Sequence, residues 1–284
     1  MEAKKEHGDH QHTCRRTSRN LLRRKYSKTS LRISSSSFGE KGIIANRQKN
    51  ISGVMQKFRD SESAQTYVAV VAGATGATGR WIVRDLLNSD KCTKVVALTR
   101  SDISVPSEVF PGADEAKISA KLVCHKIDWN FLKESGEFRP PLPGPASVAF
   151  CGLGSSPYTE ESDFTMPVAF GKASKKLGVG SMFLVSSAGA KAGSWIGLLH
   201  TLGRREDAFK AIGFGRLGIF RPGMMDRQEM TRTKELIGRI LPSRWVIDTR
   251  EVAKSMVAAA ARMKEGTHEF SHEEMKRFAS SGAL

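Results

Sequence analysis

Three glycines in the stretch VAGATGATGR, Val71 to Arg80, have the spacing of a phosphate-binding turn. They follow an apolar run and precede an amphipathic stretch, the context of a turn between a strand and a helix. In such a turn Gly73 permits the sharp bend, Gly76 lets the backbone approach a pyrophosphate, and Gly79 allows close packing of helix on strand. The N–H groups at the helix start then face the anion. The spacing therefore predicts dinucleotide binding, with a purely structural small-residue turn as the alternative. The residues expected to contact the cofactor here are Gly73, Thr75, Gly76, Ala77, Thr78 and Gly79.

The end of the next apolar run indicates which dinucleotide is bound. NAD sites usually place an acid there to hold the ribose hydroxyls. In this chain the segment KVVALTR ends in Thr99 and Arg100, and the nearest acid, Asp102, lies beyond it. Because an arginine binds a 2′-phosphate and no carboxylate repels it, we expect NADP(H) rather than NAD(H). An ordinary surface arginine is the alternative reading of Arg100.

The ends of two later apolar runs carry further candidate cofactor-binding residues. The segment KIDW places Asp128 where it can accept a hydrogen bond from the adenine amino group, with Ile127 beneath the ring. The segment FCGLGSS contributes Gly152, Leu153 and Gly154, and its glycines let the chain pass close to the cofactor ribose. Both segments are expected at the carboxyl edge of the sheet, where such folds bind ligands.

The elements that must position these residues alternate along the chain after Thr66. Short apolar runs separated by amphipathic stretches predict βαβ units and a parallel sheet covered on both faces. The expected strands are Tyr67–Ala72, Lys94–Thr99, Lys121–Ile127, Ser147–Cys151, Met182–Ser186 and Arg216–Phe220. The expected helices include Gly79–Leu87, Pro167–Leu177, Arg204–Ile212 and a stretch from Ile247 to Ala261. The predicted fold class is α/β, a doubly wound parallel sheet of the Rossmann type, with residues 61–284 as one NAD(P)-binding domain.

Residues 1–60 form a basic tail of different composition. Residues 1–66 hold fifteen Lys and Arg against six Asp and Glu, whereas the rest of the chain holds thirty against twenty-three. The +16 net charge is therefore concentrated in the tail, which has no sustained apolar period and is expected to be disordered. An Arg-rich, Ser-rich and acid-poor composition favours a mitochondrial targeting segment. A cytoplasmic tail, or a true translation start at Met55, are the alternatives.

Cysteine and histidine usage gives no metal site. Cys14, Cys92, Cys124 and Cys151 are widely spaced and read as reduced packing residues. The group formed by His7, His10, His12 and Cys14 lies in the tail, which holds no ligand geometry. No apolar run is long enough to span a membrane.

The chain resembles the atypical short-chain dehydrogenase/reductases, specifically their Tat-interacting-protein branch of NADPH-binding, oxidoreductase-like proteins. The segments that carry the resemblance are GATGATGRW, FCGLGSS, FLVSSAGA and FRPGMMDRQE. The resemblance implies that Arg221, Pro222 and Gly223 line the nicotinamide side. It also implies that Arg100 occupies the position of that branch's phosphate-binding arginine. A second arginine is common at the following position, which is Ser101 in this chain.

The catalytic pair of these dehydrogenases is missing from the positions where the resemblance puts it. In that family a tyrosine moves the proton, a lysine four residues later supports it, and a serine orients the substrate carbonyl. Ser187, or Ser186, matches the serine, but Leu198 and Leu202 stand where the tyrosine and lysine should be. His200 is the nearest titratable side chain that could replace the acid.

Three functional hypotheses follow. The favoured one is an NADP(H)-binding regulatory or scaffold protein that acts with an unidentified protein partner. The second is an active NADPH-dependent oxidoreductase with a non-standard proton donor. The third is a nucleic-acid-associated protein acting through the tail, which has few interleaved aromatic residues. The acidic residues Glu160, Glu161 and Asp163, near the expected substrate entrance, are expected to be solvated.

Overall fold

The computed structural model describes residues 66–140, 146–227 and 245–280. The predictions for the tail, residues 1–60, lie outside these described residues, as does Cys14. All elements below belong to the described part of the chain.

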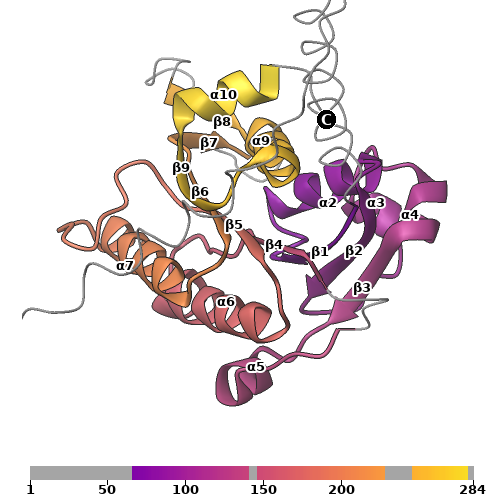
Figure 1. Ribbon diagram of the computed structural model, residues 1–284, viewed down its shortest axis with the longest axis horizontal. Helices are drawn as coiled ribbons and strands as arrows, with labels where there is room; N and C mark the ends of the chain where they lie inside the picture. Colours follow the sequence, from indigo (N-terminus) through magenta and orange to yellow (C-terminus); the bar gives the residue numbers. More distant parts are fainter. Residues whose placement is uncertain (1–65, 141–145, 228–244, 281–284) are drawn as a thin grey trace, which may run out of the picture. The chain divides into compact units, whose positions relative to one another are not determined.

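Seven parallel strands form the central sheet, in the order β3-β2-β1-β4-β5-β6-β9 (Figure 1). The chain starts in the middle of the sheet, builds one edge, and returns to build the other half, as doubly wound Rossmann folds do. The strands are β1 Tyr67–Ala72, β2 Cys92–Thr99, β3 Leu122–Lys126, β4 Val148–Cys151, β5 Ser181–Val185, β6 Arg216–Arg221 and β9 Gly266–Ser271. The predicted fold class is confirmed, and the six predicted strands are all present with ends that differ by at most two residues.

Helices cover both faces of this sheet (Figure 1). They are α2 Gly79–Asn88, α3 Pro106–Val109, α4 Glu115–Lys121, α5 Trp129–Ser135, α6 Met166–Lys176, α7 Gly197–Ile212, α9 Thr249–Arg262 and α10 His272–Ser280. A π-helical turn, η1 Glu161–Thr165, precedes α6. Two short parallel strands, β7 Met224–Asp226 and β8 Val246–Asp248, form a separate pair that the sequence did not predict.

Alternating side chains of the central strands supply two hydrophobic layers. In β1, Ala69 and Val71 face the layer that holds α2, α9 and α10, whereas Val70 and Ala72 face the layer that holds α5, α6 and α7. Because both faces are covered, the strands are apolar at nearly every position, which is why short continuous runs located them in the sequence.

Two segments differ in detail from the sequence predictions. The apolar stretch 195–203 and the predicted helix Arg204–Ile212 belong to a single helix, α7, that begins at Gly197. The C-terminal stretch THEFSHEEMKRF forms a strand followed by a helix, β9 and α10. The single long α7 matters for function because it carries Leu198, His200 and Leu202, the positions at which a proton donor was sought.

Candidate functional site

The glycine-rich turn after β1 has a backbone that only glycine fits. Gly73 has a φ of +74°, and a methyl group there would approach the carbonyl carbon of Gly152 to 2.7 Å. A methyl group at Gly79 would lie 1.9 Å from the carbonyl oxygen of Gly73. The turn is closed by the N–H of Gly76, which donates to Gly73 O at 3.0 Å. The geometry therefore requires glycine at Gly73 for the bend and at Gly79 for close packing, whereas the approach of Gly76 to a pyrophosphate stays a prediction.

The start of α2 is open to an anion. Its N-cap residue, Thr78, makes no side-chain capping hydrogen bond, and no acid lies in the first turn. The first N–H groups of a helix have no partner within the helix and carry partial positive charge. A pyrophosphate fits this uncapped helix start.

A cavity of about 620 Å³ opens beside this turn at the carboxyl ends of the strands. Its walls come from the loops after β1, β4, β5 and β6 and from one face of α7. The lining residues are Gly76–Thr78, Gly152–Ser156, Asp163, Val185–Ala188, Leu198, Leu202, Arg205, Gly223–Met225 and Arg227. Of the predicted turn residues, Gly76, Ala77 and Thr78 line this cavity with the Gly152–Gly154 segment and the serine pair, whereas Gly73, Thr75 and Gly79 do not. A cavity at this edge of the sheet is where this fold binds ligands.

Arg100 lies outside this cavity, directly after the end of β2, and is exposed. Asp102, the acid nearest to it in sequence, pairs instead with Lys126 at 3.4 Å. Among the described residues Arg100 makes no ion pair, so its guanidinium is available to a phosphate.

Asp128 is placed at the N-terminus of α5 and lines a second hollow of about 390 Å³ together with Ile127. One carboxylate oxygen, Oδ1, caps the helix by accepting from the N–H groups of Asn130 and Phe131 at 2.9 and 3.1 Å. The adenine role of Asp128 stays a prediction, and with Oδ1 used as a cap it would rest on the second oxygen, Oδ2. The structure holds this residue apart from the main cavity.

One face of α7 forms the cavity wall opposite the glycine turn. Leu198, Leu202 and Arg205 all line the cavity, at the spacing of one helix face. His200, the alternative acid, is partly buried but does not line the cavity. The positions that hold the tyrosine and lysine in the resembling family thus face the cavity here, and they carry the apolar side chains of Leu198 and Leu202.

Arg205 is a buried cation that the sequence did not single out. It is 2% exposed, and its guanidinium donates to the carbonyl oxygens of Leu153 at 3.2 Å, Asp163 at 3.2 Å and Val185 at 2.5 Å. Burial lowers the pKa of Arg205 from its ordinary value, partly offset by nearby Cys151 and Asp163. The side chain therefore ties the ends of β4 and β5 together behind the cavity.

Asp163 corrects a prediction. It was expected to be solvated, but it is 4% exposed and its Oδ2 accepts from the N–H groups of Ser155 and Thr159 and from two serine hydroxyls. The carboxylate organises the loop after β4 rather than meeting solvent, because the π-helical turn points it inward. Glu160 and Glu161, by contrast, pair at the surface with Arg204 and Lys133.

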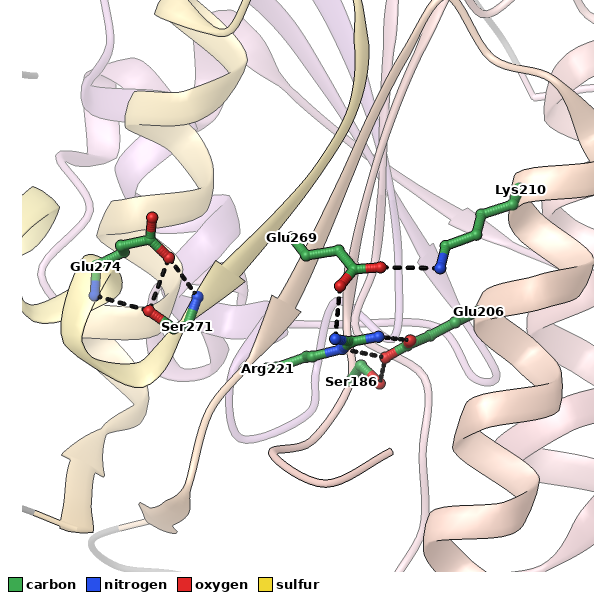
Figure 2. Close-up of polar contacts among 7 residues, drawn as sticks. All are labelled: Ser186, Glu206, Lys210, Arg221, Glu269, Ser271 and Glu274. Carbon is green, nitrogen blue, oxygen red and sulfur yellow. Dashed lines mark hydrogen bonds and ion pairs between the residues drawn. The ribbon is translucent and has the colours of Figure 1, made fainter. Parts of the chain in front are cut away.

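The two candidate serines differ sharply. Ser186 is 5% exposed and donates to the buried carboxylate of Glu206, whereas Ser187 is partly exposed and donates weakly to the carbonyl oxygen of Ala188. Glu206 in turn accepts from Arg221, whose other nitrogen bonds Glu269 (Figure 2). The hydrogen bond with Glu206 raises the pKa of Arg221 from its ordinary value.

The three residues predicted on the nicotinamide side, Arg221, Pro222 and Gly223, lie in different environments. Gly223 lines the cavity, and Pro222 is buried with its carbonyl oxygen accepting from Ala188 N–H at 2.7 Å. The guanidinium of Arg221 is held by Glu206 and Glu269 and does not line the cavity. Arg221 thus supports the wall from behind.

Sequence reasoning missed Arg205 and Glu206 because charged residues are rarely buried. The available signal was a break in pattern: both fall on the apolar side of α7, between Leu202 and Phe209.

Among the described residues, no group of three or more His, Cys, Asp and Glu side chains could hold a metal ion. Cys92, Cys124 and Cys151 are free thiols, and burial raises the pKa of each, that of Cys92 to about 11. No described helix is both long and apolar enough to cross a membrane.

Comparison with known sequences finds relatives but no matching family model. Protein HTATIP2 of Rattus norvegicus is 26% identical over 201 residues, which cover 66% of this chain and 77% of that protein. Protein FMP52, mitochondrial, of Candida glabrata is 28% identical over 163 residues, 57% of this chain and 66% of that protein. The corresponding protein of Emericella nidulans is 25% identical over 215 residues, which cover 68% of this chain and 87% of that protein. The predicted resemblance is confirmed by these homologues.

Solved structures share the fold. A putative NAD-dependent epimerase/dehydratase from Bacillus halodurans aligns with a TM-score of 0.51 at 18% identity, over 72% of this chain and 92% of that one. The triphenylmethane reductase of a Citrobacter species was solved as a complex with NADP(H). It aligns with a TM-score of 0.51 at 15% identity, over 72% of this chain and 68% of that one. At these identities the likeness establishes the Rossmann-like fold.

Proposed function

We propose that this chain, a homologue of the proteins named HTATIP2 and FMP52, binds NADP(H) as a regulatory or scaffold protein and lacks the usual proton-transfer pair. The observation that carries the proposal is the composition of the cavity. One wall is a glycine turn that a methyl group would block, and the opposite wall presents Leu198 and Leu202.

The residues present fit a dinucleotide. The tightly packed turn with Gly73 and Gly79 presents Gly76–Thr78 to the cavity at the uncapped start of α2, where a pyrophosphate would be bound. The Gly152–Gly154 segment lies beside it and Gly223 closes the far end. The complex of the similarly folded Citrobacter reductase with NADP(H) supports a dinucleotide in this position.

The preference for NADP(H) over NAD(H) rests on Arg100. Its guanidinium is exposed, has no ion pair among the described residues, and follows the strand whose end meets the adenosine ribose in this fold. A free guanidinium there attracts a 2′-phosphate, and the nearest acid is already paired with Lys126.

The same cavity argues against ordinary dehydrogenase chemistry. A bound NADP(H) supplies a hydride, but a carbonyl substrate also needs a proton donor within hydrogen-bond reach. Leu198 and Leu202 can neither donate nor accept a proton, and His200 does not line the cavity. Binding without turnover leaves the bound cofactor as a signal to a protein partner.

Calorimetric titration with NADPH and NADH, followed by an assay of NADPH consumption with a panel of carbonyl substrates, tests the proposal. We expect NADPH to bind at least about tenfold more tightly than NADH and to remain unconsumed. The double change Leu198→Tyr/Leu202→Lys is expected to raise consumption if only the proton donor is missing. Turnover by the unchanged protein would contradict the regulatory role and favour an oxidoreductase with another donor.

We extend the proposal to a mitochondrial location, with residues 1–60 as the targeting segment. The support is the basic, acid-poor composition of residues 14–50 and the mitochondrial names of the fungal homologues. A fusion of residues 1–60 to a fluorescent protein should enter mitochondria, and a diffuse cytoplasmic signal would contradict the location.

A further inference from the structure

A chain of charged and polar side chains leads from the cavity wall to the protein surface (Figure 2). Ser186 Oγ lies 2.5 Å from Glu206 Oε1 on α7. Arg221 on β6 donates through Nε to the same oxygen at 3.0 Å and through Nη2 to Glu206 Oε2. The Nη1 of Arg221 reaches Glu269 at 2.5 Å, and Glu269 also accepts from Lys210 at 2.8 Å. Four separate elements therefore contribute to one network.

The direction of each hydrogen bond in this network is fixed by chemistry. Arginine and lysine can only donate, so both oxygens of Glu206 and both of Glu269 act as acceptors. A carboxylate paired in this way carries no proton to give. Ser186 must therefore be the donor in its contact with Glu206.

This assignment has a consequence for the cavity. A serine hydroxyl has one hydrogen and two lone pairs. Because the hydrogen of Ser186 is directed at Glu206, only lone pairs remain for a ligand in the cavity that Ser186 lines. The negative charge of Glu206 behind the hydroxyl further strengthens its oxygen as an acceptor.

Burial holds the hydroxyl in this orientation. Glu206 is 2% exposed and Ser186 is 5% exposed, so water cannot readily replace the serine hydrogen. A hydrogen bond to a buried charge is stronger than a neutral hydrogen bond to a ligand, so the serine hydrogen stays on Glu206. The backbone is fixed as well, because Ser186 N–H donates to Phe220 O at 2.6 Å.

We propose that Ser186 recognises a hydrogen-bond donor of the bound ligand, namely the carboxamide amino group of nicotinamide. This rests on the proposed function, since it assumes that NADP(H) occupies the cavity. Ser186 lies at the end of β5, beside the Pro222–Met225 segment and away from the glycine turn at β1, on the nicotinamide half of the site. A serine that donates to a substrate carbonyl, the role implied by the resemblance, cannot be Ser186 in this network.

The test compares two cofactors that differ at one group. The probes are NADP⁺ and oxidised 3-acetylpyridine adenine dinucleotide phosphate, in which a methyl group replaces the carboxamide amino group. Calorimetric dissociation constants are measured for the full chain, for Ser186→Ala and for Ser255→Ala. The second variant is the matched control, because Ser255 is also a buried serine that donates its hydrogen, here to the carbonyl oxygen of Val252 on α9, but it does not line the cavity.

We expect the unchanged protein and Ser255→Ala to prefer NADP⁺ over the analogue by about tenfold, the value of one good hydrogen bond. In Ser186→Ala the preference should fall to about twofold or less. An unchanged preference in Ser186→Ala, with NADP⁺ still bound, would overturn the role of Ser186 alone. Absence of NADP⁺ binding by the unchanged protein would overturn the proposed function itself.

Discussion

The two halves of the cavity are built in opposite ways. The half formed by β1, α2 and β2 is defined by absent side chains: Gly73 and Gly79 let the turn pack against its own backbone and Gly152, and Gly76 lines the cavity. The half formed by β5, α7 and β6 is defined by side chains that are present, with Leu198, Leu202 and the largely buried Arg205 lining the cavity. Under the proposed function, the first half binds the dinucleotide, and the second carries Leu198 and Leu202 where the resembling family has its proton-transfer pair.

The difference shows that binding and catalysis are separable in this fold. Phosphate binding depends on local backbone geometry, which a short run of glycines maintains. Proton transfer depends on individual side chains at fixed positions, and two substitutions remove it. The buried network around Arg205 and Glu206 links the elements of the second half. An acid, Asp163, lines the cavity, and its carboxylate is bound by the loop after β4.

The largest effect should come from filling the turn of the first half. Gly79→Ala places a methyl group 1.9 Å from the carbonyl oxygen of Gly73, so the turn must distort. We expect a loss of more than about 3 kcal/mol in the free energy of unfolding, measured by urea denaturation, and loss of NADPH binding. Gly193→Ala is the control, because a methyl group there meets nothing within 4 Å and no unusual φ is required. A Gly79→Ala protein that binds NADPH normally would refute the cofactor turn.

The next effect should come from the second half. Arg205→Met leaves the carbonyl oxygens of Leu153 and Val185 buried without their donor, at a cost of about 2–3 kcal/mol in the free energy of unfolding. Arg204→Met, the neighbouring control, removes an exposed pair with Glu160 and should cost about 1 kcal/mol or less. Equal losses in urea denaturation would contradict the structural role of Arg205.

A smaller effect tests cofactor choice at the far end of the first half. Arg100→Ala removes the proposed phosphate contact and should weaken NADPH binding by about tenfold, or about 1.4 kcal/mol, with NADH binding unchanged. Calorimetry with both cofactors measures the change. A parallel loss for NADH would mean that Arg100 does not read the 2′-phosphate.

The smallest effect concerns the outer end of the network. The hydrogen bond from Lys210, aided by Arg221, lowers the pKa of Glu269 below its ordinary 4.5. Because the pKa of Glu269 is lower in the folded than in the unfolded protein, ionised Glu269 stabilises the fold at pH values above its ordinary pKa. This stabilisation is lost as the pH falls through the pKa of the folded protein. Glu269 is 38% exposed, so the contribution at neutral pH is less than about 1 kcal/mol.

Glu269→Gln should therefore flatten the decrease in unfolding free energy between neutral pH and about pH 3.5. Glu134→Gln is the matched control, since Glu134 is exposed and makes no ion pair among the described residues. An acid-induced decrease as steep in Glu269→Gln as in the unchanged protein would show that the pair is too solvated to matter.

Much of the fold was predictable because buried parallel strands are short apolar runs bounded by helical patterns. The strand ends and α9, which begins at Thr249 after its Asp248 cap, agree closely with the sequence reading. The β7–β8 pair was not predictable, since each strand has three residues and each finds its partner about twenty residues away. Asp163 was misread for a related reason: a charged residue in an acidic stretch is usually solvated, and only the inward turn of η1 buries it.

The sequence by itself determined the glycine turn, the doubly wound sheet and the presence of Leu198 and Leu202 where the resembling family has its tyrosine and lysine. These are properties of residue type and order within single segments. The tertiary structure alone decided that Arg205 and Glu206 are buried, that Arg221 supports the wall from behind, and that the hydrogen of Ser186 points away from the cavity. Those outcomes depend on Ser186, Glu206, Arg221 and Glu269 meeting from four elements, and no local pattern encodes the direction of a hydrogen bond between them.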